Sequence, residues 1–226
     1  HLSVHSFPTR RSSDLWLAAA IVLTAAMAYA VFAPSIDYEF VYDDQILIVD
    51  NPDVHGLSSG DLRNIFVGRD YQNYLPLRML VYAVIYNFAK LHPAPYHIVN
   101  ILFHMANSVL ALLLCLRLLN GSGGGRAGIP PIGAFAPGLI FAVHPIHVES
   151  VAWVSGLKEL LSTFFCLLSA MAFLRLRKSP PAGSVAWAFP AALVLYACAV
   201  LSKATAVFLP LAFLLYDWLF PEEARK

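Results

Sequence analysis

Apolar residues along this chain gather into long runs that are separated by short polar stretches. The first run, residues 16–33, contains no charged residue and is about as long as one bilayer crossing. Such a run predicts a helix, because a helix satisfies its own backbone hydrogen bonds within lipid. Further runs share this character: 96–119, 132–148, 160–174, 185–201 and 204–220. The pattern predicts an all-α, polytopic membrane protein with about six transmembrane helices.

The segment between the first two runs, residues 34–96, mixes polar and apolar positions. In its GDLRNIF stretch, Leu62, Ile65 and Phe66 fall on one helical face behind Ser59, a candidate helix cap. This arrangement is typical of a short helix that lies on a membrane surface. We therefore expect a long outer loop that contains interfacial helices.

Positive charge helps to decide the path of residues 75–91, which are apolar but include two basic side chains. Short basic connections favour the cytoplasmic side of a membrane. Those at 117–126 and 175–178 share one side whether or not 75–91 crosses. With a cytoplasmic start for the first helix, the arrangement in which 75–91 stays at the interface is favoured. The outer loop 34–96 is then expected to lie outside the cytoplasm.

Composition supports the membrane interpretation. The chain is 59% hydrophobic and 13% charged, and its mean hydropathy is +0.66, values typical of a membrane protein. A net charge of +1 gives no indication of a nucleic-acid partner. Three cysteines, Cys115, Cys166 and Cys198, fall within apolar runs, so neither a disulfide framework nor a metal-binding spacing is expected.

The first fifteen residues, HLSVHSFPTRRSSDL, differ abruptly from the apolar run that follows. They resemble a translated sequencing adapter, which predicts a non-native tail over 1–15 and a native membrane domain over 16–226. A cytosolic tail ahead of a signal anchor is the alternative. The adapter interpretation is favoured, and these residues are therefore given no weight in the topology.

Acidic residues are concentrated in the outer loop, and the pair Asp43-Asp44 is the most distinctive of them. In extended backbone, neighbouring side chains point to opposite faces, so one of the two is expected to reach a shared cavity. A carboxylate suits a general base for a hydroxyl nucleophile, while a divalent cation could instead bridge the pair. A solvated acidic loop is the competing interpretation.

A polar stripe runs along the second apolar segment. His97, Asn100, His104 and Asn107 recur at spacings that place them on one helical face. Lipid cannot satisfy such groups, so the stripe is expected to face protein or water. It either lines a polar cavity or holds neighbouring helices together.

The turn HPIHVE contains His144, His147 and Glu149. Two histidines and a carboxylate can bind zinc, but Pro145 breaks any helix across the pair and no third ligand stands at helical spacing. A polar cavity lining is therefore favoured, and no metal ligand is assigned.

Two lysines stand at the ends of apolar runs. Lys158 precedes Glu159 at the start of one run, and Lys203 lies in a very short turn between two others. Snorkelling of the ammonium group to the interface explains either position. Lys203 could equally bind a phosphate through charge-assisted hydrogen bonds.

In this order, FVYDD, NPD, NYLPL, YHIVNILFH, HPIHVESVAWVSGLKELLSTFF and LSKA resemble one family. They are similar to the membrane part of the protein O-mannosyltransferase-like glycosyltransferases of the GT-C superfamily. Within it, the group whose transmembrane segments precede tetratricopeptide repeats is the most similar. The resemblance covers about residues 36–217 and implies a partial GT-C fold.

The resemblance also implies roles for several residues. In the superfamily a polyprenyl-phosphate sugar lies in the outer leaflet, and an acid of the first outer loop is the catalytic base, which corresponds to Asp43. Asp44 takes the second acidic position of that loop, and Glu159, or else Glu149, matches a second acidic site. Lys203 corresponds to a lysine near the donor phosphate. The histidines match the family pattern without a settled role.

We therefore expect a glycosyltransferase that transfers a sugar, with mannose the first candidate, from a polyprenyl phosphate to a hydroxyl group on an exported protein or glycan. The family has more spans and carries repeats, so we interpret the chain as a fragment of a longer protein. The bacterial inner membrane, with the active face outside the cytoplasm, is the expected location. A transporter with charges at mid-membrane depth and a non-catalytic membrane scaffold are the alternatives.

Overall fold

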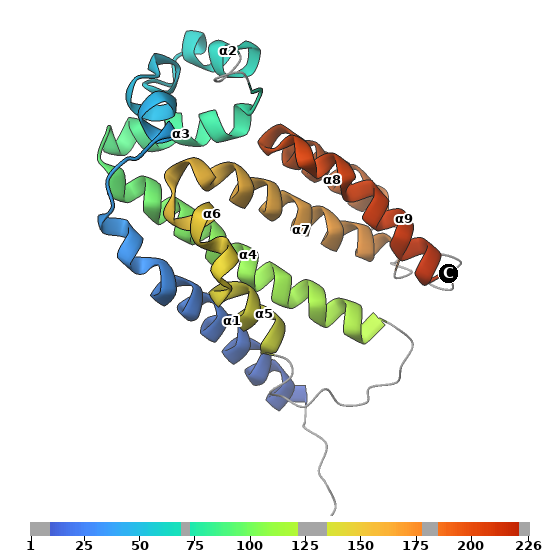
Figure 1. The fold of residues 1–226 in the computed structure, drawn as a ribbon. Coiled ribbons are helices and arrows are strands. Elements are labelled where there is room, and N and C mark those ends of the chain that lie inside the picture. Colours follow the sequence, from blue (N-terminus) through green and yellow to red (C-terminus); the bar gives the residue numbers. More distant parts are fainter. Residues whose placement is uncertain (1–9, 69–72, 122–134, 178–184, 222–226) are drawn as a thin grey trace, which may run out of the picture.

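The computed structural model describes residues 10–68, 73–121, 135–177 and 185–221, and these form helices and turns without a strand (Figure 1). The described elements are α1 (Arg10–Phe32), η1 (Ala33–Asp37), η2 (Gln45–Val49), η3 (Pro52–Val54), α2 (Ser59–Val67), α3 (Pro76–Ala89), α4 (Pro93–Gly121), α5 (Ala136–Val143), η5 (Pro145–His147), α6 (Val148–Ala152), η6 (Val154–Gly156), α7 (Leu157–Arg177), α8 (Val185–Ser202), η7 (Ala204–Phe208) and α9 (Leu209–Leu219). The prediction of an all-α membrane protein is confirmed.

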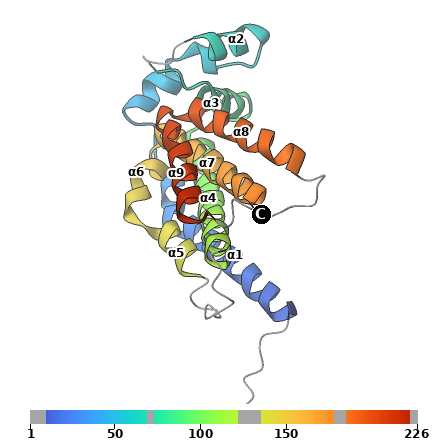
Figure 2. The same cartoon turned by 90° about the vertical axis from the view of Figure 1, so that its right-hand side faces the viewer.

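Three of the described segments are long and apolar enough to cross a membrane: Leu15–Asp37, Pro93–Leu119 and Val154–Arg177. They correspond to α1, α4 and α7. Helix α4 packs against both α1 and α7, so these three helices form the centre of the bundle (Figure 1, Figure 2). Helix α1 begins at Arg10, within the predicted tail 1–15, whose residues 1–9 lie outside the described part of the chain.

The other three predicted spans form shorter helices. The run 132–148 was expected to be one helix, but α5 ends at Val143, and residues 132–134 lie outside the described part. The cause is Pro145, which cannot donate a backbone hydrogen bond and which keeps His144 extended, at φ −66° and ψ 128°. Helices α8 and α9 contain 18 and 11 residues.

The outer loop folds onto one end of the bundle, where α2 and α3 lie in both views (Figure 1, Figure 2). Helix α3 has 14 residues, which gives a length of about 21 Å at about 1.5 Å per residue. This is shorter than the roughly 30 Å hydrocarbon core of a bilayer. That α3 stays at the interface remains a prediction.

The predicted cap of α2 was wrong by one residue. Ser58 is the N-cap: its Oγ accepts a hydrogen bond from Asp61 N at 3.2 Å, and Asp61 Oδ2 accepts one from Ser58 N at 2.9 Å. The expected apolar face also divides, since Ile65 is buried whereas Phe66 is 43% exposed. Ile65 therefore packs into the protein, and Phe66 remains at the surface.

A buried apolar cluster attaches the outer loop to the bundle. Ile48 and Val54 of the loop, Tyr82 of α3 and Leu157 of α7 all belong to it and are fully buried. Tyr82 Oη also donates a hydrogen bond to the carbonyl of Val154 at 3.1 Å. The loop is thus a folded layer whose core continues into the start of α7.

The polar stripe of α4 faces the inside of the bundle, as predicted, and all four of its members are buried. Asn100 Nδ2 donates to the carbonyl of Trp153 at 2.9 Å, and Asn107 Nδ2 donates to that of Leu160 at 2.9 Å. His104 Nε2 lies 3.0 Å from the carbonyl oxygen of Ala142, near the end of α5. The stripe therefore bonds backbone groups where neighbouring helices begin or end, which favours the helix-packing interpretation.

Gly138 in α5 lets three helices approach closely, and it yields a first prediction. A Cβ at this position would lie 2.7 Å from Thr24 Oγ1 of α1 and 3.0 Å from Leu112 Cβ of α4. We expect Gly138→Val to lower the free energy of unfolding by about 1–3 kcal/mol through overpacking. Thermal unfolding in detergent measures this. Gly60→Val is the control, because a Cβ there meets only Ser58 Oγ at 3.6 Å; an equal loss in both variants would contradict the packing role.

Candidate functional site

The candidate site lies where the chain breaks helical structure between α5 and α7. Over residues 144–156 it forms two short 3₁₀ turns, η5 and η6, with the five-residue helix α6 between them. Gly156 makes this path sterically feasible, because a Cβ there would lie 2.4 Å from the carbonyl oxygen of Ser150. The break leaves the backbone N–H of Ser155 available to bond the outer loop.

Asp44 joins the outer loop to this break. Its carboxylate is fully buried. Oδ1 accepts hydrogen bonds from Ser155 N at 2.9 Å and Ser155 Oγ at 2.5 Å, and Oδ2 accepts one from Val41 N at 3.1 Å. Burial raises the pKa of this carboxyl above its ordinary value, and the hydrogen bonds from Ser155 and Val41 offset part of the rise.

Asp43, by contrast, is exposed. The two neighbouring carboxylates do differ in their surroundings, but the expected extended backbone was wrong: Asp44 has helical angles, φ −60° and ψ −34°. The two side chains point to different surroundings because a turn holds Asp44 inward against Ser155. Asp43 is left exposed at the surface, and its role as the base remains a prediction.

Tyr42 and Trp153 reinforce the same connection. Trp153 Nε1 donates to the carbonyl of Val41 at 3.3 Å, and its ring meets the Tyr42 ring edge-on at a centroid distance of 6.3 Å. Tyr42 has φ 51°, a left-handed conformation that is costly for a residue with a bulky side chain. The surrounding contacts hold this strained turn in place directly before the aspartate pair.

Glu159 and Lys203 form an ion pair at the same end of α7. Lys203 Nζ donates to both carboxylate oxygens of Glu159. Both side chains are partly exposed, 31% for Lys203 and 33% for Glu159. The pair joins the first turn of α7 to the turn between α8 and η7, two places that lie 44 residues apart in the chain.

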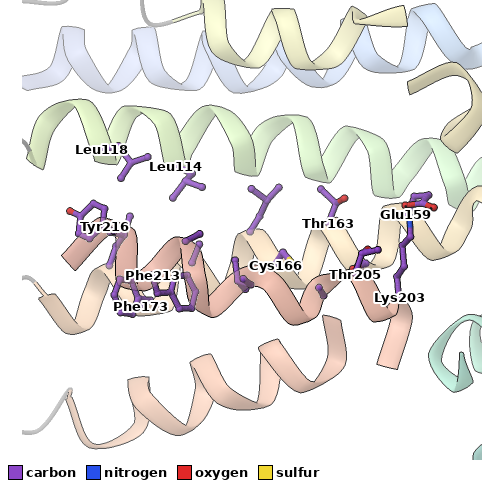
Figure 3. A pocket seen from close by; sticks show the side chains of 17 residues that line it. Leu114, Leu118, Glu159, Thr163, Cys166, Phe173, Lys203, Thr205, Phe213 and Tyr216 are labelled. Carbon is purple, nitrogen blue, oxygen red and sulfur yellow. Dashed lines mark hydrogen bonds and ion pairs between the residues drawn. The ribbon is translucent and has the colours of Figure 1, made fainter. Parts of the chain in front are cut away.

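A large apolar cavity of about 460 Å³ extends from this ion pair along α7 and α9. Figure 3 shows Glu159 and Lys203 at one end and Phe173 and Tyr216 toward the other. Leu114 of α4 and Phe213 of α9 form part of its wall. The cavity therefore has one charged end and an otherwise mostly apolar lining.

A second, smaller pocket of about 190 Å³ adjoins the first, because Glu159 lines both. Its wall is partly polar and comes from the break before α7 and the first turn of that helix. The lining residues are Ile146, Glu149, Ser150, Trp153, Ser155, Gly156, Lys158 and Glu159. The two pockets thus share Glu159 in their walls.

The other residues expected to line a cavity divide into two groups. Glu149 lines the smaller pocket, whereas His97, Asn100, His104, His144 and His147 line neither of these two cavities. His104 and His147 lie near each other instead, with ring centroids 5.1 Å apart. Among the described residues, no group of three histidine, cysteine or acidic side chains could hold a metal ion.

Ser155 and Trp153 were not predicted as site residues. A single serine in a turn gives no functional signal, because serine is common in turns for local reasons. The Ser155 contact with Asp44 spans 111 residues, so no local pattern could reveal it. The sequence indicated a role for these two residues only through their place in the stretch HPIHVESVAWVSGLKE, which carries part of the family resemblance.

The chain is similar in sequence to several curated proteins, but it matches no family model and no solved structure. Human protein O-mannosyl-transferase TMTC3 is 33% identical over 190 residues, which cover 80% of this chain and 19% of the relative. Human protein O-mannosyl-transferase TMTC1 is 32% identical over 226 residues, which cover 92% of this chain and 24% of the relative.

The match extends to insects. Protein O-mannosyl-transferase Tmtc1 of Drosophila melanogaster is 30% identical over 191 residues, which cover 81% of this chain and 21% of the relative. The chain thus spans between 19% and 24% of the length of these curated relatives. Because all three are animal proteins, they give no support to the predicted bacterial inner membrane.

The neighbouring aspartates provide a matched test of the loop connection. Asp44→Ala leaves the buried N–H of Ser155 without its carboxylate acceptor, so we expect the free energy of unfolding to fall by about 2–4 kcal/mol. Asp43→Ala removes an exposed side chain and should change it by less than about 0.5 kcal/mol. Thermal unfolding in detergent compares the two. Equal effects would mean that Asp44 does not attach the loop.

Proposed function

Because the chain is a homologue of the TMTC protein O-mannosyl-transferases over most of its own length, we propose that it serves the transfer of mannose to a protein hydroxyl group. The donor in this proposal is a polyprenyl-phosphate sugar, and the active face lies outside the cytoplasm. Since the chain spans only part of its relatives, transfer is proposed for the full-length protein.

Support comes above all from one observation: groups that are far apart in the sequence meet around the first turn of α7. The outer loop reaches it through the bonds between Asp44 and Ser155. The turn after α8 reaches it through the ion pair between Lys203 and Glu159. In this proposal, the loop that carries Asp43 and the Glu159–Lys203 pair both approach the first turn of α7, where a lipid headgroup would lie.

The apolar cavity supports a lipid-linked donor. A polyprenyl chain needs a long apolar surface, and its phosphate needs a cation at the end of that surface. The cavity of about 460 Å³ has this form, with Lys203 at its charged end (Figure 3). Glu159 accepts from the Lys203 ammonium group and so orients it, and the ammonium group can donate to a phosphate oxygen as well.

The proposed reaction is a direct displacement. The oxygen of the acceptor hydroxyl attacks the anomeric carbon, and Asp43 takes the hydroxyl proton as the new carbon–oxygen bond forms. The bond between the anomeric carbon and the phosphate oxygen breaks, and the phosphate leaves with the electron pair. Lys203 stabilises the negative charge on the leaving phosphate.

The two alternative functions receive less support. A transporter would place its charged groups along a path at mid-membrane depth, whereas Asp44, Glu159 and Lys203 lie around one end of α7. A non-catalytic scaffold would not need these groups to meet. Their convergence beside two cavities therefore favours an enzyme.

Lys203 gives a test of donor binding. In Lys203→Ala we expect the affinity for sugar-free polyprenyl phosphate to fall by at least about tenfold, since a charge-assisted hydrogen bond is lost. Binding can be measured with protein in lipid nanodiscs. Lys90→Ala is the control, because Lys90 lies over the Tyr86 ring in the outer loop, away from the cavity. An unchanged affinity in Lys203→Ala would exclude this phosphate site.

Asp43 gives a test of the chemical step. In Asp43→Asn we expect the rate of mannose transfer to fall by roughly 10²-fold or more, the range for loss of a general base. Donor affinity should stay unchanged, since Asp43 does not line the donor cavity. Transfer assays use the full-length protein in membranes, with Glu39→Gln as an exposed acidic control from the same loop. Normal transfer by Asp43→Asn would show that another group is the base.

A further inference from the structure

The smaller pocket beside Glu159 has no role in the mechanism above. It is lined by a carboxylate, an ammonium group, serine hydroxyls and an indole, which come from Glu149, Lys158, Ser150, Ser155 and Trp153. Among the described residues, neither the Glu149 carboxylate nor the Lys158 ammonium group has a hydrogen-bond or ion-pair partner. A pocket with a carboxylate and an ammonium group available and one aromatic wall is suited to a polyhydroxylated ligand.

The position of this pocket restricts the ligand further. In a lipid-phosphate sugar the sugar ring is bonded directly to the phosphate, so its site must begin where the phosphate site ends. Glu159 lines both this pocket and the apolar cavity, and it forms an ion pair with Lys203, which lines the apolar cavity. Lipid tail, phosphate and sugar would therefore follow one another in the order of the bonds that join them.

The aromatic wall is held rigidly enough to act as a recognition surface. The Trp153 indole donates to the carbonyl of Val41 and packs edge-on against Tyr42. The Asp44 bonds to Ser155 and the close approach of Gly156 to the Ser150 carbonyl group restrain the backbone that lines the same pocket. A ligand would therefore lose little affinity to the ordering of this wall.

We infer that this pocket binds the sugar ring of the donor, with Glu149 accepting hydrogen bonds from sugar hydroxyls and Trp153 covering the C–H face of the ring. The assignment presupposes the proposed function and adds its sugar-specificity residues. A peptide acceptor is the other ligand that such a pocket could take. The sugar is favoured because the pocket is lined by Glu159, and the Glu159 carboxylate orients Lys203, the residue proposed to bind the donor phosphate.

The test compares two ligands, polyprenyl-phosphate mannose and sugar-free polyprenyl phosphate, on the protein in lipid nanodiscs. The ratio of their affinities measures the contribution of the sugar alone. We expect the wild type to bind the mannose form at least about tenfold more tightly, because hydrogen bonds to a charged group add affinity. In Glu149→Gln and in Trp153→Leu the ratio should fall several-fold, while the affinity for sugar-free lipid stays unchanged.

Two controls separate the pocket from general effects. Glu39→Gln removes an exposed acid elsewhere in the outer segment, and Trp187→Leu removes an exposed tryptophan from α8. Neither should change the ratio. Glu149 is itself exposed, so Glu149→Gln should fold normally. Trp153→Phe keeps an aromatic face and should retain more of the ratio than Trp153→Leu, an effect that loss of folding would not produce.

The outcomes distinguish this assignment from the proposed function. If the wild type does not bind sugar-free polyprenyl phosphate, the proposed function fails. If it binds that lipid but Glu149→Gln and Trp153→Leu keep the wild-type ratio, the sugar site is overturned while the lipid site stands. If these variants instead lose affinity only for an acceptor peptide, the pocket belongs to the acceptor, and the assignment is likewise overturned.

Discussion

A buried carboxylate must find hydrogen-bond donors, and this requirement holds the site of this protein together. Asp44 is fully buried and accepts bonds from Val41 in its own loop and from Ser155 just before α7. If the outer loop and the start of α7 separated, the Asp44 carboxylate would lose its bonds from Ser155 in apolar surroundings. The outer loop and the start of α7 are therefore fixed relative to each other, and Asp43 is fixed with them.

The broken segment between α5 and α7 is stabilised by similar means. Where a helix ends, its last carbonyl groups lose their partners, and lipid cannot supply new ones. Asn100 and His104 of α4 lie beside the carbonyls of Trp153 and Ala142, which follow or end short helices, and Asn107 donates to the carbonyl of Leu160 in the first turn of α7. The polar stripe of α4 thus makes an irregular backbone tolerable in a largely apolar bundle, and this backbone supplies the walls of the smaller pocket.

The two cavities together suit a ligand that is half lipid and half polar. The larger has apolar walls that end at the Lys203–Glu159 ion pair, and the smaller begins at the same glutamate with polar walls. An ion pair at such a boundary costs little, because its partial exposure to water preserves part of its solvation. The same exposure leaves the lysine accessible to a second anion.

Local periodicity was enough to predict the helices, the inward face of α4 and the absence of strands from the described residues, because each depends on neighbours within a few turns. It was also enough to mark the aspartate pair, although the backbone expected there was wrong. Pro145 was recognised as a helix breaker, but the expected apolar run 132–148 was not ended at it. The contact between Asp44 and Ser155 spans 111 residues and that between Glu159 and Lys203 spans 44. Only the tertiary structure could decide these contacts and the two pockets beside them, because they depend on how separate helices pack and not on the pattern within any one of them.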